Sequence, residues 1–187
     1  MRQIEIRPLR SPDVAELLPL ISGYVSPAKY VVSKRETPAL MTIELRLVEL
    51  EQPYRKPPDL VDEAEAARYA SVAAAGFSWA AYAGDQPVGL ALAEPRDWNR
   101  SLWVHEFRIA DGWRGQGLGR RLMLTLFEQA QTAGLRIVVC ETQNTNVPAI
   151  RFYRALGFVL DAVDLSLYTN ADVEQGEVAI FMKRRLG

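Results

Sequence analysis

The chain has 187 residues, 49% of them hydrophobic, and its formal net charge is −1 at pH 7. That length and apolar content suffice for one domain with a sizeable core. A charge so close to zero gives no electrostatic reason to expect nucleic acid or an anionic membrane as the main partner. The N-terminal residues show no signal-peptide segment and no stretch approaches a membrane span, so we expect a cytoplasmic protein.

The first hundred residues alternate short apolar runs with turn signals. Residues 2–9 predict a strand, and residues 11–21 begin with the Ser-Pro-Asp pattern of a helix start. Residues 62–74 are rich in alanine with interspersed charges, which predicts a helix. Residues 77–83 and 88–93, separated by a four-residue turn, form the clearest hairpin pattern in the chain.

Residues 23–60 have the least regular pattern. Residues 42–50 alternate partly like a strand, whereas residues 52–59 contain three prolines, which we take to exclude a regular element. We therefore predict a substrate-side loop and an edge strand for this part of the chain.

A glycine-rich segment at residues 114–119, RGQGLG, joins a strand-like run at 102–110 to a helix-like run at 120–133. Alternate glycines remove Cβ atoms where a ligand approaches the backbone, and the first amides of a helix lack internal partners and bind anions. A P-loop needs Gly-Lys followed by Ser or Thr, and a Rossmann fingerprint needs glycine in place of Arg120, so both are excluded. Two interpretations stay open, a phosphate-holding loop and a glycine-rich turn without a ligand.

One cysteine and one histidine exclude an internal disulfide and a zinc cluster, so we expect no metal. The cysteine, Cys140, lies in the apolar run 135–140, which predicts a buried strand. An inert core thiol is therefore favoured over a nucleophile.

A second motif at residues 141–158 reads as a strand end, a capped helix and a glycine stop. Asn146 fits an N-cap, Pro148 suits the first turn, and Gly157 suits a left-handed C-cap. Two more strands are predicted after it, over residues 158–168 and 177–183. Without a repeat or linker, the chain is expected to form one domain, 1–187, with a mixed α/β sheet.

The two motifs resemble those of the GNAT family of acyl-CoA-dependent N-acyltransferases. The family's pyrophosphate loop, R/Q-x-x-G-x-G/A, is matched at residues 114–119, and its N-x-x-A-x-x-x-Y helix at residues 146–153. Residues 141–144, 167–170 and 177–181 further resemble the streptothricin acetyltransferase branch.

The resemblance implies a GNAT-like α/β (α+β) fold with a mixed, mostly antiparallel central sheet flanked by helices. It implies an acceptor-side part in residues 1–100, and an acetyl-CoA-binding core with the last strands in residues 101–187. The cosubstrate it implies is acetyl-CoA. The residues implied in binding it are Arg108, Ile109, Ala110, Arg114, Gly115, Gln116, Gly117, Leu118, Gly119, Arg120, Asn146 and Tyr153.

Acetyl transfer from a thioester to an amine requires an acid for the leaving thiolate and a base for the ammonium group. Tyr153 matches the family's tyrosine and is the expected acid, with simple core packing beside Phe152 as the alternative. Glu106, on the strand before the loop, is the expected base. His105 is the runner-up, although a lone strand histidine is more often structural. Strand alternation places these two side chains on opposite faces, so at most one should face the acceptor.

The acceptor-binding residues are less well defined by the sequence. His105 and Glu141 are the candidates, and Glu141 either attracts a cationic amine or is a solvated strand end. Asn146 either bonds to the cofactor arm or only caps its helix.

Three functions follow from the resemblance. The first is acetyl-CoA-dependent acetylation of a primary amine on a small molecule, with a streptothricin-like antibiotic as the candidate. The alternatives are a protein or peptide N-acetyltransferase and a regulatory module that binds acetyl-CoA without turnover. A homodimer is compatible with the sequence, which does not fix the oligomeric state.

Overall fold

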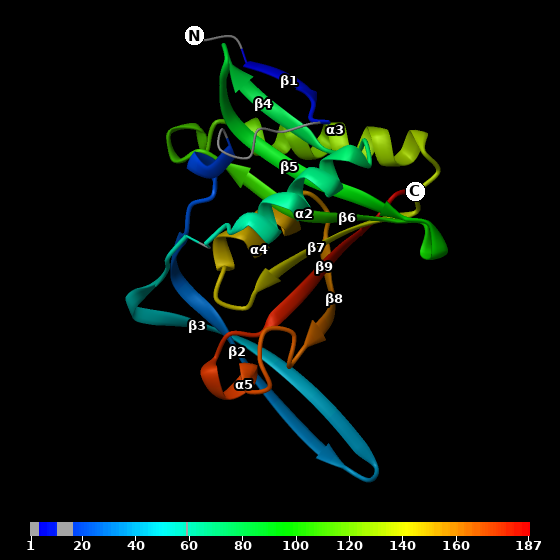
Figure 1. The fold of residues 1–187 in the computed structure, drawn as a ribbon. Coiled ribbons are helices and arrows are strands. Elements are labelled where there is room, and N and C mark those ends of the chain that lie inside the picture. Colours follow the sequence, from blue (N-terminus) through cyan, green and yellow to red (C-terminus); the bar gives the residue numbers. More distant parts are fainter. Residues whose placement is uncertain (1–3, 11–16, 59) are drawn as a thin grey trace. The chain divides into compact units, whose positions relative to one another are not determined.

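The structure is a computed structural model that describes residues 4–10, 17–58 and 60–187 (Figure 1). Its strands are β1 (Ile4–Pro8), β2 (Tyr24–Thr37), β3 (Leu40–Lys56), β4 (Trp79–Ala83), β5 (Gln86–Arg96), β6 (Ser101–Ile109), β7 (Ile137–Gln143), β8 (Val159–Asp164) and β9 (Ala179–Arg185). Its helices are η1 (Leu18–Leu20), α2 (Glu63–Ala74), η2 (Asp97–Asn99), η3 (Asp111–Trp113), α3 (Leu118–Thr132), α4 (Val147–Ala155) and α5 (Asp172–Gln175). The helix start predicted at residues 11–16 lies outside the described residues.

Seven strands form one sheet in the order β1-β4-β5-β6-β7-β9-β8, and β2 pairs with β3 in a separate sheet. The β6–β7 pair is parallel, whereas β1–β4, β4–β5, β5–β6 and β8–β9 are antiparallel. The expected mixed, mostly antiparallel sheet is therefore confirmed.

The chain divides into two compact units that interleave along the sequence. The first unit comprises Met1–Ser22, Pro58–Cys140 and Arg184–Gly187, and the second comprises Gly23–Pro57 and Glu141–Lys183. Strands β7 and β9 each contribute residues to both units. Within the described part of the chain, none of the helices is long and apolar enough to cross a membrane.

The predicted hairpin and the helices predicted at residues 62–74 and 120–133 are present, and their ends follow from local chemistry. The hairpin β4–β5 turns at Gly84, whose positive φ of 68° suits glycine. Helix α2 begins after Asp62, whose carboxylate accepts the amide of Glu65 at 2.8 Å, a standard N-cap bond. Helix α3 buries an apolar face at helical spacing, which includes Leu122 and Leu126.

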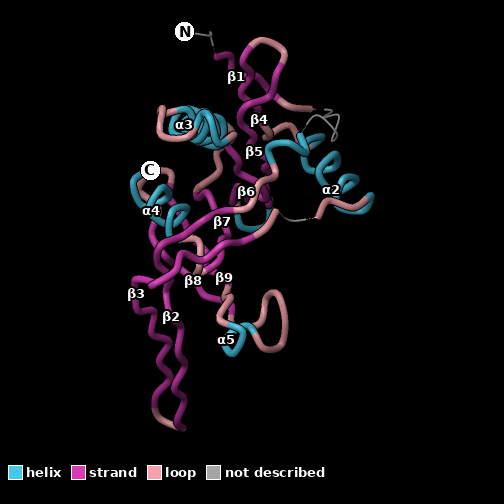
Figure 2. Tube along the Cα trace, turned by 90° about the vertical axis from the view of Figure 1, so that its left-hand side faces the viewer, coloured by secondary structure: helices cyan, strands magenta, loops and turns pink. Residues whose placement is uncertain are grey.

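Strand β4 is buried on both of its faces. Successive side chains of a strand point to opposite sides of the sheet, so its residues divide between two clusters. Ala80 and Tyr82 belong to a cluster with α2 and η1, whereas Ala81 and Ala83 pack with Leu118 of α3. Helices α2 and α3 thus cover opposite faces of this part of the sheet (Figure 2).

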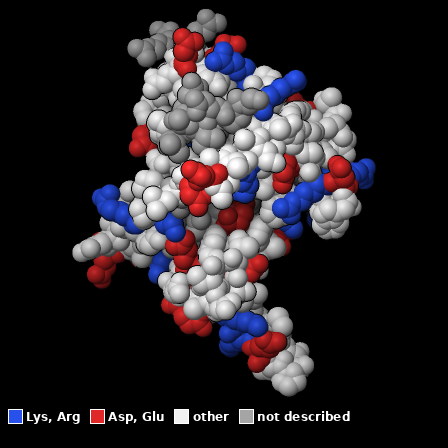
Figure 3. Space-filling view, viewed as in Figure 1, with Lys and Arg blue, Asp and Glu red and all other residues white. Residues whose placement is uncertain are grey.

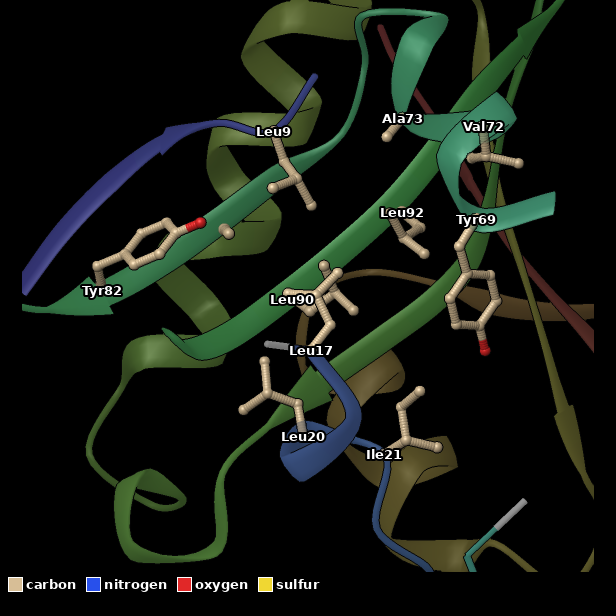
Figure 4. Close-up of a cluster of buried hydrophobic side chains, with 11 residues drawn as sticks. Leu9, Leu17, Leu20, Ile21, Tyr69, Val72, Ala73, Tyr82, Leu90 and Leu92 are labelled. Carbon is tan, nitrogen blue, oxygen red and sulfur yellow. The ribbon is translucent and has the colours of Figure 1, made fainter. Parts of the chain in front are cut away.

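The core on the α2 side contains eleven buried residues (Figure 4). Tyr69 of α2 is 2% exposed, and its ring packs into this cluster beside Leu92 while its hydroxyl points away from it. The core therefore fixes the position of one phenol group at the edge of the cluster.

In the second unit, helix α4 has the predicted signals at both ends. The Asn146 side chain accepts the amide of Ala149 at 3.2 Å, and Gly157 ends the segment with a φ of 83°. The predicted strand over residues 158–168 ends earlier, at Asp164, and the segment between the two predicted strands contains the short helix α5.

The prediction of an irregular loop within residues 23–60 is wrong. Strands β2 and β3 form one long antiparallel hairpin, and β3 runs through Pro53 to Lys56. The register shifts between Ser26 and Ala28, so Pro27 and Pro53 both fall where the ladder is interrupted. A proline has no N–H to donate, so a bulge tolerates it where a regular ladder does not.

A single buried amide joins three segments of the second unit. The Asn144 side chain donates to the carbonyls of Tyr30 at 2.6 Å and Gly176 at 3.2 Å, and it accepts the amide of Val178 at 2.7 Å. Asn144 is 1% exposed, so these bonds replace water for a group that would otherwise be unsatisfied. The hairpin is therefore anchored at Tyr30 of β2.

Candidate functional site

The glycine-rich loop lies where the sequence predicts it, between β6 and α3 of the first unit. Gly115 and Gly117 have φ values of 73° and 80°, in the left-handed region that favours glycine. A Cβ at either position would meet no described atom within 4 Å. The turn itself, rather than crowding by the protein, therefore requires these glycines, and the space beside them is open to a ligand.

The loop presents backbone amides at the start of α3. The helix is capped by Gly117, whose carbonyl accepts the amide of Arg121 at 3.1 Å. The amides of Leu118, Gly119 and Arg120 precede this bond, so they have no acceptor within the helix. Free amides at the positive end of a helix form a site for an anion.

The two arginines beside the loop have different environments. Arg114 donates to the carbonyl of Ile109 and to the hydroxyl of Ser22, each at 3.0 Å, and pairs with Asp111 at 2.9 Å. Arg114 therefore braces the base of the loop. Arg120 is exposed, and its side chain forms no hydrogen bond or ion pair with the residues that the structure describes. Arg120 is thus the better placed of the two to meet an anion.

Two other loop side chains stabilise the turn. Gln116 donates to the carbonyl of Gly112 at 2.8 Å, which closes the turn on itself. Trp113 packs against the cluster that contains Leu118.

Strand β6 leads into the loop with one edge paired. Its residues pair with β5 as far as Ile109, and the amide of Ala110 donates to the carbonyl of Val88 at 3.0 Å. The parallel pairing with β7 ends at Val104 and Cys140. Within the first unit, the other edge of residues 105–109 therefore has no strand partner among the described residues.

Glu106 is held at both carboxylate oxygens. Tyr69 donates its hydroxyl to Oε1 at 3.0 Å, and the Arg108 guanidinium bonds to Oε2 at 2.8 Å. Burial, and then the negative charge of Glu106, raise the pKa of Tyr69. Tyr69 therefore stays protonated as a donor, and the Glu106 side chain, 13% exposed, has a fixed orientation.

His105 does not point away from Glu106 as simple alternation predicts. The β5–β6 register shifts, so Leu92 pairs with Glu106 and Ala93 with Val104, which leaves His105 as an extra residue in a bulge. Both His105 and Glu106 consequently bond to side chains of α2.

The contacts of His105 define its tautomer. The Arg68 guanidinium lies 3.0 Å from Nδ1, and Glu94 lies 2.9 Å from Nε2. Because an arginine only donates, Nδ1 accepts and the proton of a neutral imidazole is on Nε2, directed at Glu94. Both ring nitrogens are therefore fully used, whereas each Glu106 oxygen keeps a second lone pair that can accept a proton, which favours Glu106 over His105 as the base.

The second unit carries the other predicted site residues. Tyr153 is 7% exposed, and its ring centroid lies 5.5 Å from that of Phe152 and 5.4 Å from that of Phe158. Asn146 caps α4 through its side chain. The packing of Tyr153 and the capping by Asn146 are both observed, and neither is incompatible with a second role.

Glu141 is part of a cluster that the sequence does not reveal. It accepts a short hydrogen bond from the Tyr168 hydroxyl. Glu177 pairs with Lys56 at 2.5 Å and accepts the Tyr54 hydroxyl at 3.1 Å. Burial and the nearby carboxylates raise the pKa of Tyr168, so it remains a donor. The second unit thus gathers two carboxylates and two tyrosines from widely separated segments.

Among the described residues, no group of three or more histidine, cysteine, aspartate or glutamate side chains is arranged to hold a metal ion. Cys140 is 1% exposed within β7, as expected for a buried strand.

The sequence and the fold were compared with those of known proteins. Residues 43–158 match the acetyltransferase (GNAT) family. The streptothricin acetyltransferase of Streptomyces lavendulae is 35% identical over 95 residues, which are 51% of this chain and 50% of that protein. Streptothricin acetyltransferase A of Bacillus subtilis (strain 168) is 32% identical over 85 residues, 46% of this chain and 49% of that protein. The chain spans about half the length of these curated relatives.

Solved structures match over a larger part of the chain. The crystal structure of nourseothricin acetyltransferase has a TM-score of 0.78 and 28% identity, and the match covers 98% of this chain and 99% of that one. A structure from Bacillus anthracis str. Ames, in complex with acetyl coenzyme A, has a TM-score of 0.76 with the same coverage. At 22% sequence identity, this match shows a similar fold only. Because the family match covers more than half of the sequence, the chain belongs to the acetyltransferase (GNAT) family.

Proposed function

We propose that the chain transfers an acetyl group from acetyl-CoA to a primary amine of a small molecule, and that a streptothricin-like antibiotic is the candidate acceptor. The observation that carries this proposal is the run of free amides at the start of α3, directly after a strand with an unpaired edge in its own unit. The similarity to streptothricin acetyltransferases supports the choice of acceptor.

The cosubstrate has two matching features in the first unit. The pyrophosphate is bound by the amides of residues 115–119, with the Arg120 guanidinium as a charged partner. The pantetheine arm is bound by the backbone of residues 108–110, and an amide of this stretch donates to the thioester oxygen as negative charge develops on it. Neither role depends on a side chain of the strand.

The reaction requires removal of protons from the amine nitrogen and delivery of a proton to the leaving thiolate. Glu106 takes a proton from the substrate ammonium, directly or through one water, and the amine nitrogen then attacks the thioester carbonyl carbon. The carbon–sulfur bond breaks, and the leaving thiolate takes the hydroxyl proton of Tyr153. The nitrogen loses its second proton to water as the amide forms, and the Tyr153 phenolate regains a proton from water. Asn146 and Glu141 are assigned to the cofactor arm and the cationic acceptor, respectively, with His105 as a second acceptor contact.

The loop assignment predicts that Gly117→Glu abolishes acetyl-CoA binding measured by calorimetry. The substitution strains a residue with a φ of 80° and places a negative charge beside the pyrophosphate. Gly84→Glu is the matched control, because that glycine has a φ of 68° in the β4–β5 turn. Unchanged affinity in Gly117→Glu would refute the assignment.

The acid assignment predicts that Tyr153→Phe lowers kcat by about 100-fold while acetyl-CoA affinity is retained. The ring contacts with Phe152 and Phe158 survive the change, so the fold should be preserved. Tyr82→Phe, at another buried tyrosine, should leave kcat unchanged. A normal kcat in Tyr153→Phe removes this hydroxyl from the mechanism.

The base assignment predicts that Glu106→Gln lowers kcat by about 100-fold or more. The amide oxygen can still accept from Arg108, and the Tyr69 hydroxyl can accept from the amide NH2, so packing is retained. Tyr69→Phe, which removes only one hydrogen bond to the carboxylate, should have a smaller effect. The exposed Glu128→Gln is the control. Wild-type rates for Glu106→Gln at every pH would exclude Glu106 as the base.

The proposed activity is tested by acetyl-CoA-dependent thiol release with streptothricin, aminoglycosides, polyamines, amino acids and basic peptides. We expect release with streptothricin or another small amine. Release only with peptides would make the chain a peptide acetyltransferase. Tight acetyl-CoA binding without release by any acceptor would support a regulatory module.

A further inference from the structure

The β2–β3 hairpin has one apolar and one charged face. Directly paired residues of an antiparallel ladder lie on the same face, and alternate pairs lie on opposite faces. The pairs on the apolar face are Tyr30–Leu47, Val32–Leu45, Lys34–Ile43 and Glu36–Met41. The pairs on the other face include Val31–Arg46, Ser33–Glu44 and Arg35–Thr42. We call the apolar set of Val32, Met41, Ile43, Leu45 and Leu47 the arm stripe.

The arm stripe runs toward the tip of the hairpin, past the residues that other elements of the second unit cover. Near the base, Val32 is only 8% exposed, and the Arg154 guanidinium of α4 lies 5.8 Å from the Tyr30 ring centroid. Farther out, Ile43 is 38% exposed and Met41 is 60% exposed. The outer half of the hairpin extends past α4, α5, β8 and β9 of the same unit in both views (Figures 1 and 2).

An isolated two-stranded hairpin is marginally stable in water unless one face is covered. The outer hairpin nevertheless keeps a regular register as far as Thr37 and Leu40. Its apolar alternation on β3 also persists as far as Met41, where the unit provides no cover. Both features are those of a strand pair that packs against another surface.

The charges on the apolar face favour a copy of the same surface as the partner. Lys34 and Glu36 both lie on this face and pair with each other at 2.5 Å, so covering it buries no net charge. In Figure 3 the end of the molecule where Figure 1 has the hairpin tip is mostly uncharged, with basic and acidic groups side by side. A two-fold axis between Lys34 and Glu36 would bring each lysine to the glutamate of the other copy.

We propose that the arm stripe packs against the arm stripe of a second copy of this chain, about a two-fold axis between Lys34 and Glu36. The regular ladder from Ala28–Glu49 to Thr37–Leu40 gives a face about 30 Å long and 10 Å wide. Such a face amounts to about 600 Å² over the two copies, which is below the size of stable specific interfaces, so the dimer is weak and reversible, in the micromolar range.

The dimer is tested by sedimentation velocity of the full chain between about 1 and 200 µM, a range chosen around micromolar affinity. The wild type should shift from monomer to dimer across this range. Ile43→Glu should raise the dissociation constant at least about 100-fold, because it places a charge in the centre of the stripe. The control is Thr42→Glu, on the opposite face beside Arg35, which should leave the dissociation constant unchanged.

Exchanging the charges of Lys34 and Glu36 distinguishes loss of the dimer contact from loss of folding. Lys34→Glu and Glu36→Lys should each weaken self-association, because each places like charges across the axis. An equimolar mixture of the two variants should form a heterodimer, and the double variant K34E/E36K should recover the wild-type dissociation constant. A wild type that stays monomeric at 200 µM would overturn the proposal and leave the stripe to a different partner. A dimer that Ile43→Glu and the charge variants leave intact would overturn it as well.

Discussion

The proposed cosubstrate site depends on backbone groups where β6 ends and α3 begins, which have no partner in the first unit among the residues that the structure describes. The left-handed conformations of Gly115 and Gly117 and the bracing by Arg114 hold the loop so that the first amides of α3 are free. The helix dipole makes the same place favourable for negative charge. In the proposed function these backbone groups bind the phosphate, so the interaction depends on the geometry of the loop rather than on the identity of its side chains.

One residue of the hydrophobic core, Tyr69, also contacts the proposed base, Glu106. Tyr69 is held by the apolar cluster under α2, and its hydroxyl in turn holds Glu106 from one side while Arg108 holds it from the other. A general base works best when its orientation is fixed before the substrate arrives. Core packing and the position of the proposed base are therefore linked. A substitution in the cluster that moves Tyr69 should also change the orientation of the Glu106 carboxylate.

Local signals in the sequence predicted the elements that depend on local chemistry. Asn146 and Gly157 mark helix ends because a cap is a contact between near neighbours. Two predictions failed where a bulge intervened, since a bulge depends on the partner strand: the hairpin through Pro53, and the orientation of His105. Other contacts join segments that are distant in the sequence, so no local sequence pattern predicts them. They are the contacts of Glu177 with Tyr54 and Lys56, and of Glu141 with Tyr168.

Amide hydrogen exchange with and without saturating acetyl-CoA tests the central claim most directly, because exchange reports each backbone N–H separately. The account predicts slower exchange in the bound protein at residues 105–110 and 115–120. Helix α2, which packs on the opposite face from α3, should keep its exchange rates. Acetyl-CoA that binds by calorimetry but leaves both segments unprotected would contradict the account, since the cosubstrate would then be held elsewhere.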